Sequence, residues 1–405
     1  MQLEFLSKLY HNLQSQKEKI SLSNGSLLIN WKKPMFIVLF VIALFLTACS
    51  TPNIPTQPAV EVTCPELVCP EQPRYEDLWS SSAHADSSAE AFTHWDQDDP
   101  PEIPVECAKC HSRPGFIDFL GVDESFTQRV DQPADVGTTI TCYTCHNEAS
   151  IDMTSAIFPS GVRVRDLDSE AVCIQCHQGR TSTSIVEAAI RGVNPTGQDT
   201  SIQEISFVDS HSPSGATPFG SVVHVGYEYS QNNYAGQFYR GDEFFSCLRC
   251  HNQHSLELKD ETCSECHTIA GNDIKNIRVD TTDYDGDGDV NEGIASEIDT
   301  LKAALLAAIQ SYGENTVHTP IGYDAVNYPY FFIDVNSNGI IEPEEAIREN
   351  WYDAWSPRLL RAAYNYNYIS HDPGAYAHNS DYILQLLYDS IDDIGGDVSL
   401  FSRPQ

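Results

Sequence analysis

Basic side chains are scarce in this chain of 405 residues. Lys and Arg number 23 against 58 Asp and Glu, which gives a formal charge of −35. Such an acidic surface repels phosphate groups and argues against binding to nucleic acid. It favours solubility and cationic partners, including metal ions. Long apolar runs and methionine are scarce as well, with three methionines in the whole chain. The composition predicts an acidic, soluble body.

The one long apolar run, "MFIVLFVIALFLTA" at residues 35–48, is too short to span a bilayer comfortably. It follows Lys32 and Lys33, and basic residues before a short apolar core are typical of a signal peptide. The run ends in "LTAC", which resembles a bacterial lipobox. We therefore expect residues 1–48 to be a lipoprotein signal peptide, with lipid attached to Cys49. The alternatives are an uncleaved anchor or a start at Met35. Cleavage would remove five basic and two acidic residues and change the charge from −35 to −38.

Residues 49–74 are rich in proline and threonine, which indicates a flexible tether. This segment contains Cys64 and Cys69 in "CPELVCP", with no histidine after either cysteine. In an exported protein we expect the pair to form a local disulfide. The alternative is two free or intermolecularly paired thiols.

Long periodic segments are missing from residues 75–271. The pattern predicts a short helix at residues 184–192 and a strand or hairpin arm at residues 221–229. A region so poor in regular structure cannot easily form an ordinary core, so we expect bound groups to organise it. The region from 272 to 405 differs, because it contains three helical patterns. These are an amphipathic stretch at residues 294–313, one capped by Ser356 with Pro357 next, and one from Ser380 to Gly395. The fold class we predict is mainly α with much irregular structure.

Ten of the thirteen cysteines lie in five C-x-x-C-H motifs. Two thiols three positions apart can form thioethers to the vinyl groups of a haem, and the next residue offers an imidazole to the iron. The motifs predict five covalently bound haem c groups in residues 75–271. They are Cys107-Ala-Lys-Cys110-His111, Cys142-Tyr-Thr-Cys145-His146, Cys173-Ile-Gln-Cys176-His177, Cys247-Leu-Arg-Cys250-His251 and Cys263-Ser-Glu-Cys266-His267.

Zinc and disulfides are the alternatives for these motifs. A zinc site uses C-x-x-C pairs without requiring a histidine directly after them, and here all five pairs have one. A C-x-x-C disulfide fits export but is typically redox-active, and five in one chain would be unusual. Haem explains the spacing and the histidine together.

Each haem iron also needs a sixth ligand if the protein is an electron carrier. Only Met153 survives the predicted cleavage, so methionine can serve one haem at most. Histidine is the available alternative, and bis-histidine ligation implies low-spin haems of low potential. The candidates outside the motifs are His84, His94, His211, His224, His254, His318, His371 and His378. His254 is too close to His251 to cap the opposite face of its own haem, so we expect it to reach another one.

Several stretches resemble an exported bacterial family of multihaem c-type cytochromes with an EF-hand-like tail. They are "AHADSSAEAFTHWDQDDPPEIPVECAKCHSRPGFIDFLG", "CLRCHNQHSLEL" and "RLLRAAYNYNYISHDPGAYAHNSDYILQLLYDSI", and the likeness covers most of residues 75–395. The resemblance implies extracytoplasmic electron transfer. It also implies that the distal ligands are His84, His94, His211, His254 and His378. The sequence after His211 departs from the family's pattern, and His224 is the substitute.

Two acidic loops match or approach the EF-hand pattern. The loop at residues 334–345 matches it fully, with ligands Asp334, Asn336, Asn338, the Ile340 carbonyl and Glu345, and with Gly339 at the turn. The loop at residues 283–294 offers Asp283, Asp285, Asp287 and Asp289, but Ile294 stands where the closing acid belongs. Glu292 or Glu297 is the replacement. The alternative is an acidic turn that caps a helix. We expect one or two Ca²⁺ ions in a structural role, in a helical region at 272–405 packed on the haem core.

The function that these features favour is a membrane-anchored, exported electron carrier. It would take electrons from a redox protein or a quinol-linked donor and pass them to an external acceptor. One alternative is a reductase of a small nitrogen or sulfur compound with one open haem site. Two observations disfavour this hypothesis: the sequence has no C-x-x-C-K motif, and it has enough histidines to give every haem iron a sixth ligand. A subunit of a cytochrome filament is the other. The sequence leaves enzymatic activity open and favours an electron carrier over an enzyme, because no C-x-x-C-K motif is present.

Overall fold

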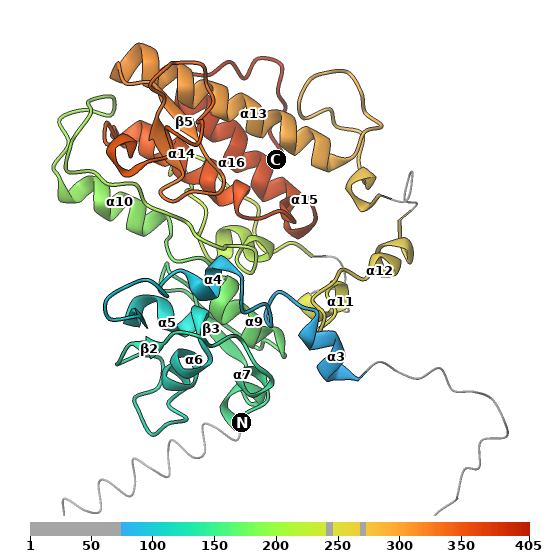
Figure 1. The fold of residues 1–405 in the computed structure, drawn as a ribbon. Coiled ribbons are helices and arrows are strands. Elements are labelled where there is room, and N and C mark those ends of the chain that lie inside the picture. Colours follow the sequence, from blue (N-terminus) through green and yellow to red (C-terminus); the bar gives the residue numbers. More distant parts are fainter. Residues whose placement is uncertain (1–73, 240–245, 268–272) are drawn as a thin grey trace, which may run out of the picture. The chain divides into compact units, whose positions relative to one another are not determined.

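The computed structural model describes residues 74–239, 246–267 and 273–405 (Figure 1). The predicted signal peptide, Cys49, Cys64 and Cys69 lie outside these residues, so the lipid and disulfide predictions stay predictions. Within the described part of the chain, no helix combines the length and apolar character that a membrane span needs.

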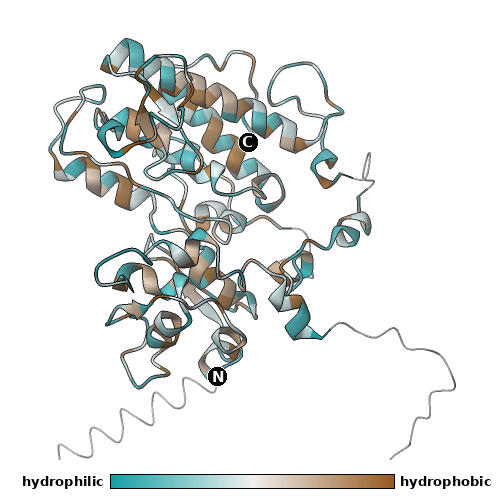
Figure 2. Ribbon diagram, viewed as in Figure 1, coloured by the Kyte–Doolittle hydropathy of each residue, from teal (hydrophilic) through white to brown (hydrophobic). Residues whose placement is uncertain are grey.

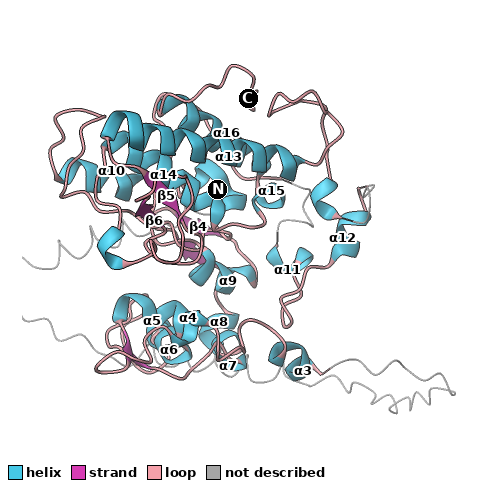
Figure 3. Ribbon diagram, turned by 45° about the horizontal axis from the view of Figure 1, so that its top comes forward, coloured by secondary structure: helices cyan, strands magenta, loops and turns pink. Residues whose placement is uncertain are grey.

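Helices and irregular segments make up most of the described chain, and the strands are few and short (Figure 3). The prediction of a mainly α fold with much irregular structure is confirmed. Up to residue 267 the helices are α3 (Tyr75–Ser80), α4 (Glu90–Thr93), α5 (Val105–His111), α6 (Arg113–Leu120), α7 (Cys142–Cys145), α8 (Glu148–Ile151), α9 (Glu170–His177), α10 (Thr183–Gly192), the 3₁₀ helix η1 (Thr217–Val222), α11 (Cys247–Cys250) and α12 (Asp260–Ser264). The predicted helix at residues 184–192 is α10.

After residue 272 the helices are η3 (Ile274–Asn276), α13 (Ile294–Tyr312), the π-helical turn η4 (Gly313–Val317), η5 (Arg348–Asn350), α14 (Pro357–Ser370), α15 (Ala375–His378) and α16 (Ser380–Asp393). Of these, α13, α14 and α16 are longer than the helices before residue 267. Three antiparallel strand pairs occur in the described chain: β1 (Glu102–Ile103) with β2 (Ala134–Asp135), β3 (Ser155–Ile157) with β4 (Arg163–Arg165), and β5 (Ile321–Tyr323) with β6 (Phe331–Ile333).

Helices α13, α14 and α16 lie side by side and form the centre of the main core (Figure 1). Apolar residues run along all three helices (Figure 2). In α13 the predicted amphipathic pattern turns Leu301, Leu305 and Ile309 inward, where each is fully buried. Ser356 accepts a hydrogen bond from the backbone of Leu359, which confirms it as the N-cap of α14. For α16 the pattern predicts Ser380 as the N-cap, and this prediction was wrong by one residue. Asn379 is the N-cap, since its side-chain oxygen accepts from Tyr382 N at 3.3 Å.

The predicted strand or hairpin arm at residues 221–229 does not form. The start of this segment belongs to η1, and no strand pairs with the rest. The side chains still follow the alternating pattern of the sequence, since Val225, Tyr227 and Tyr229 are all buried. Their backbone partners are side chains: Asn365 accepts from Tyr227 N at 2.8 Å and donates to Tyr227 O at 2.9 Å. The side-chain amide of α14 thus replaces the neighbouring strand that the pattern predicts.

One hydrophobic cluster contains residues from both parts of the chain. It extends from Ala156 and Phe158 through Ile174 in α9 to Leu386 and Ile394 near the C-terminus. A smaller cluster of Ile103, Ala108, Val130 and Ala134 packs around α5. The second half of the haem-motif region therefore shares an ordinary apolar core with the C-terminal helices, which the thin periodicity of residues 75–271 did not predict.

Candidate haem motifs and calcium-type loops

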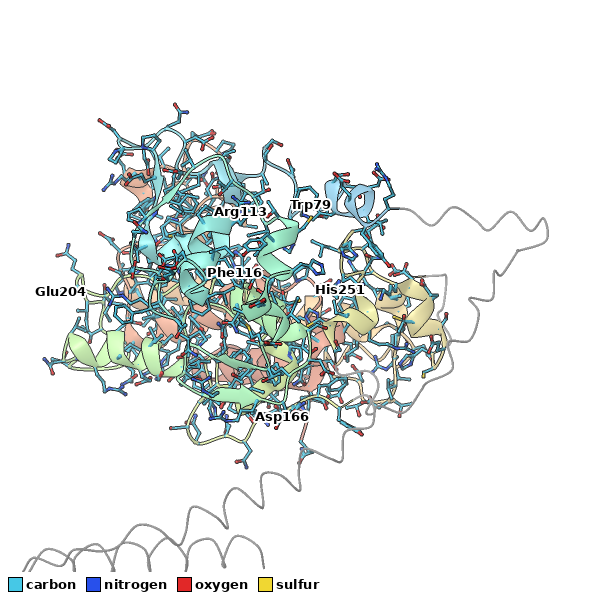
Figure 4. All side chains as sticks on the ribbon, turned by 90° about the horizontal axis from the view of Figure 1, so that it is seen from below. Trp79, Arg113, Phe116, Asp166, Glu204 and His251 are labelled. Atoms are coloured by element: carbon cyan, nitrogen blue, oxygen red, sulfur yellow. The ribbon has the colours of Figure 1, made fainter. Side chains whose placement is uncertain are left out.

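All five C-x-x-C-H motifs place their cysteines on one helical turn. Helices α5 and α9 end at the histidine itself, His111 and His177. In the other three motifs the histidine follows the turn, and its backbone N–H bonds to the carbonyl of the first cysteine at 2.8 Å (His146), 2.9 Å (His251) and 3.0 Å (His267). The local fold thus presents two thiols and an imidazole together five times. His251 is labelled in Figure 4.

The ten motif cysteines form no disulfide. Within the described part of the chain, each group of three or more side chains close enough to share a metal ion is acidic, and none includes a cysteine or histidine. A four-ligand zinc site at these motifs is therefore not assembled, which weighs against the zinc alternative.

His254 lies opposite the proximal histidine of the second motif. The ring centres of His146 and His254 are 6.2 Å apart and the ring planes differ by 10°. A bond from a first-row metal to imidazole nitrogen is about 2.0 Å long, so two rings on opposite sides of one ion have centres roughly 6 Å apart. The separation therefore fits one iron between the rings. Tyr75 stacks on the other side of His254, with ring centres 4.6 Å apart.

Two further histidine pairs have the same spacing. His84 and His177 have ring centres 6.3 Å apart with planes 28° apart, and His111 and His211 have centres 5.8 Å apart with planes 64° apart. Each pair joins a proximal histidine to a histidine from outside the motifs. The residues present thus fit an iron ligated by two imidazoles at three motifs.

The fourth motif lies within electrostatic range of His378. Burial is the main reason why the pKa of His251 is lowered, and the His378 ring acts in the same direction, which places it within electrostatic range. His378 Nδ1 lies 2.7 Å from Oδ1 of Asp372, which is 2% exposed. Burial acts to raise the pKa of Asp372, but the His378 ring and several hydrogen bonds bring it below its ordinary value. This carboxylate is therefore charged and accepts a hydrogen bond from His378 Nδ1.

Hydrogen bonds fix the tautomer of other candidate ligands. His111 Nδ1 lies 2.8 Å from the Ala91 carbonyl oxygen, which can only accept, so Nδ1 carries the proton and Nε2 is left for a metal. His211 Nδ1 is 3.3 Å from Oδ2 of Asp209. These partners orient the rings in the way that metal-ligating histidines usually require.

Burial keeps several of these imidazoles neutral. It lowers the pKa of His84 to about 4, with a further contribution from His177, and it lowers the pKa of His111 and His177 below the ordinary value. Neutral imidazole is the form that binds a metal ion. The electrostatics and the ring spacing therefore fit the same ligation.

Three histidines stand apart from this pattern. His94 is largely exposed and lies 3.4 Å from Glu90, with its ring against Trp95. His224 Nδ1 pairs with Glu228 at 2.7 Å, and it is His211 whose ring faces the proximal His111, which supports His211 over its substitute. Among the described residues, His267 makes no ring contact with another histidine. The structure thus brings three of the five predicted distal histidines, His84, His211 and His254, into ring contact with a proximal histidine. His378 and His94 come only within electrostatic range of one, His251 and His111 respectively.

The loop at residues 334–345 has a tight network of carboxylate contacts. Asp334 Oδ2 accepts from Gly339 N at 2.7 Å, and Asn336 Oδ1 accepts from Asn338 N at 3.0 Å. Glu345 Oε1 closes the loop by accepting from Val335 N at 3.0 Å and from Asn336 N at 3.3 Å. Asp334 and Glu345 are both buried.

The loop at residues 283–294 repeats this network. Asp283 Oδ2 accepts from Gly288 N at 2.9 Å, as Asp334 does at the same loop position. Glu297 Oε2 accepts from Tyr284 N and from Asp285 N, the positions that Glu345 binds in the other loop. Glu297 is fully buried and also pairs with Arg278. It therefore fills the place of the acid that the sequence lacks at Ile294.

Both candidate replacements lie near the loop's carboxylates. One acidic group contains Asp285, Glu292 and Glu297, and the other contains Asp283, Asp285 and Asp287; within each, the ligand atoms lie within 4.8 Å of one another. Asp289 belongs to neither group, and its Oδ1 accepts from Asn291 N at 2.9 Å. Carboxylates this close repel one another, so a divalent cation fits the charge of the site.

Sequence reasoning missed the residues that orient the histidines. Asp209 and Asp372 lie two and six positions before their histidine partners, a spacing with no recognised motif. A carboxylate near each non-motif histidine is the signal that could have pointed to them, since such acids often hold ligating imidazoles.

Comparisons with known proteins agree with the motif chemistry. No family model and no solved structure matches the chain. It is 26% identical over 373 residues to the C-type polyheme cytochrome OmcC of Geobacter sulfurreducens, which covers 79% of this chain and 46% of that protein. It is 27% identical over 379 residues to the C-type polyheme cytochrome OmcB of the same species, which covers 76% of this chain and 46% of that protein. The chain thus spans about half the length of the curated relatives that it matches, and it is a distant homologue of Geobacter polyhaem c-type cytochromes.

Proposed function

We propose that the chain is an exported electron-transfer cytochrome that binds five haem c groups. The observation that carries this proposal is the repeated histidine pair, seen most clearly in His146 with His254 and His84 with His177. Each pair has the spacing of two imidazoles on one iron and begins at a C-x-x-C-H motif. The homology to polyhaem c-type cytochromes supports several haems rather than one.

Bound haem would supply one-electron redox chemistry. The chain's own residues hold it in place and tune it. The ten motif cysteines form the thioethers, His111, His146, His177, His251 and His267 are the proximal ligands, and the paired histidines are the distal ones. Because two imidazoles saturate an iron, the paired sites favour low-spin centres of low potential that transfer electrons without binding substrate.

The acidic loops would each hold a Ca²⁺ ion in a structural role. The second loop uses Asp334, Asn336, Asn338, the Ile340 carbonyl and Glu345. The first uses Asp283, Asp285 and Asp287, with Glu297 as its closing acid. The ion in the first loop would link α13 to the segment before it. The lipid on Cys49, a membrane or periplasmic donor and an external acceptor complete the proposal.

A haem count by mass and an EPR spectrum of the purified, oxidised protein test this function. Five haems with low-spin signals at the three paired sites support electron transfer. Fewer than five haems contradicts the assignment of all five motifs, and high-spin signals at the paired sites contradict the bis-histidine ligation.

A second function has one observation in its favour. Among the described residues His267 makes no ring contact with another histidine, so a small molecule could bind a haem iron at the fifth motif. A single high-spin centre that binds nitrite or cyanide, and that disappears in the variant Cys263→Ala/Cys266→Ala, would favour the reductase. The same centre would also accept a histidine from a neighbouring subunit, as in a filament.

A further inference from the structure

The third motif, Cys173–His177 in α9, contacts the first motif in α5. Cys110 Sγ lies 4.0 Å from the Gln175 carbonyl oxygen, and Cys176 Sγ lies 3.9 Å from the Lys109 carbonyl oxygen. The contact is reciprocal, and the two thiols also interact directly. The second cysteines of the first and third motifs therefore face one another.

The fourth motif meets the same helix from its other end. Ser246, the N-cap of α11, donates from Oγ to Glu170 Oε2 at 3.0 Å, and Glu170 is the first residue of α9. Burial, followed by the nearby Cys173 thiol, raises the pKa of Cys247 to about 12. The first cysteines of the third and fourth motifs thus lie within electrostatic range.

The fifth motif joins the fourth. Arg249 in α11 pairs with Glu265 at 2.8 Å, and its carbonyl accepts from Thr262 Oγ1 in α12 at 3.3 Å. Lys259 N donates to the Cys250 carbonyl at 2.8 Å, which fixes the connection between the two helices. These contacts bring α11 and α12 together.

We propose that the third motif is the junction of the haem array. Thioether bonds hold one edge of a haem at its two cysteines, so cysteines of different motifs that lie together bring haem edges together. The haem at Cys173 and Cys176 therefore has the first and fourth haems as neighbours, and the fifth follows the fourth. This inference rests on the proposed function, because it requires haem at all five motifs.

The variant Cys173→Ala/Cys176→Ala, prepared as the otherwise haem-loaded protein, tests the junction. Neighbouring ferric haems are paramagnetic and couple magnetically, so loss of a neighbour changes an EPR signal. The signal of the first haem is identified as the one that the variant Cys107→Ala/Cys110→Ala loses. We expect it to lose its coupling and sharpen when the third haem is removed. In the matched control Cys142→Ala/Cys145→Ala, which removes the second haem in the same way, we expect no change in the signal of the first haem.

A first-haem signal that is unaltered by removal of the third haem overturns the junction, as does an equal change in the control. The reciprocal readout does not need the third-motif variant to fold. Removing the first haem must change one of the remaining signals, and a change in none or in all of them overturns the junction too. A parent protein with five haems and the wrong couplings refutes the junction alone, whereas a parent with fewer than five refutes the proposed function as well.

Discussion

The rings of His146 and His254 are nearly parallel and their centres lie 6.2 Å apart, although the two residues belong to different haem motif segments. His254 follows the fourth motif by three positions, yet it faces the proximal histidine of the second. A histidine next to one attachment site thus faces the proximal histidine of another. Cross-ligation of this kind would tie the segments around α7 and α11 together when haem binds.

Replacing His254 with alanine should leave the second haem with one imidazole. We expect one new high-spin signal in the EPR spectrum, with the haem count unchanged. In the background Cys142→Ala/Cys145→Ala the second haem is missing, so the same substitution should add no high-spin signal. His224→Ala, which removes a histidine paired with Glu228, is the matched control and should leave the spectrum unchanged. A new high-spin signal that persists in the double variant would assign His254 to a different haem.

The substitution Asp372→Asn tests how His378 is oriented. The neutral amide still accepts a hydrogen bond from His378 Nδ1, but it no longer makes the imidazole more basic. Partners of this kind are typically worth about 10–100-fold in metal affinity. We expect the reduced variant to bind carbon monoxide at one haem, because the weakened His378 ligand is displaced. Asp353→Asn, at an exposed position, is the control. Equal carbon monoxide binding in both variants would contradict the proposal that Asp372 supports His378 as a haem ligand.

Calcium should raise the thermal stability of the protein through both loops. An ion at 100 times its dissociation constant stabilises the folded state by about 2.7 kcal/mol per site. Glu345→Gln and Glu297→Gln should each abolish part of the calcium-dependent rise in melting temperature, and the double variant should abolish it all. In the first loop, Glu292→Gln is the comparison that separates the two candidate closing acids. If Glu292→Gln removes more of the calcium response than Glu297→Gln, the assignment of Glu297 is wrong.

Glu187 should contribute to stability against acid. It accepts from Tyr227 Oη at 2.7 Å and pairs with Arg361 at 2.8 Å. Burial acts to raise its pKa, but Tyr227 and Arg361 outweigh it, so the pKa lies below the ordinary 4.5. A lowered pKa gives stability that is present above the unfolded value and lost as the pH falls through the folded one. Urea unfolding should therefore show less loss of stability below pH 4.5 in Glu187→Gln than in the parent. If the free energy of unfolding falls equally with pH in both proteins, the ion pair of Glu187 does not contribute to stability against acid.

Local chemistry explains what the sequence predicted well. The C-x-x-C-H spacing is read within one helical turn, and all five motifs adopt such a turn. The stripe of Leu301, Leu305 and Ile309 and the Ser356 cap are local patterns too, and both formed as expected. The strand expected at residues 221–229 does not form, because the backbone of Tyr227 bonds to the Asn365 side chain instead of a neighbouring strand. Asn365 lies far along the chain, and no periodic pattern in the sequence indicates this contact.

The sequence by itself determined which residues can attach haem, that methionine cannot supply most of the remaining ligands, and where the acidic loops lie. These depend on residue types within a few positions of one another. Only the tertiary structure decided that His254 faces His146, that Glu297 lies where the loop lacks its closing acid, and that the third motif contacts the first and the fourth. Such relationships join distant segments through packing and hydrogen bonds, and no spacing along the chain encodes them.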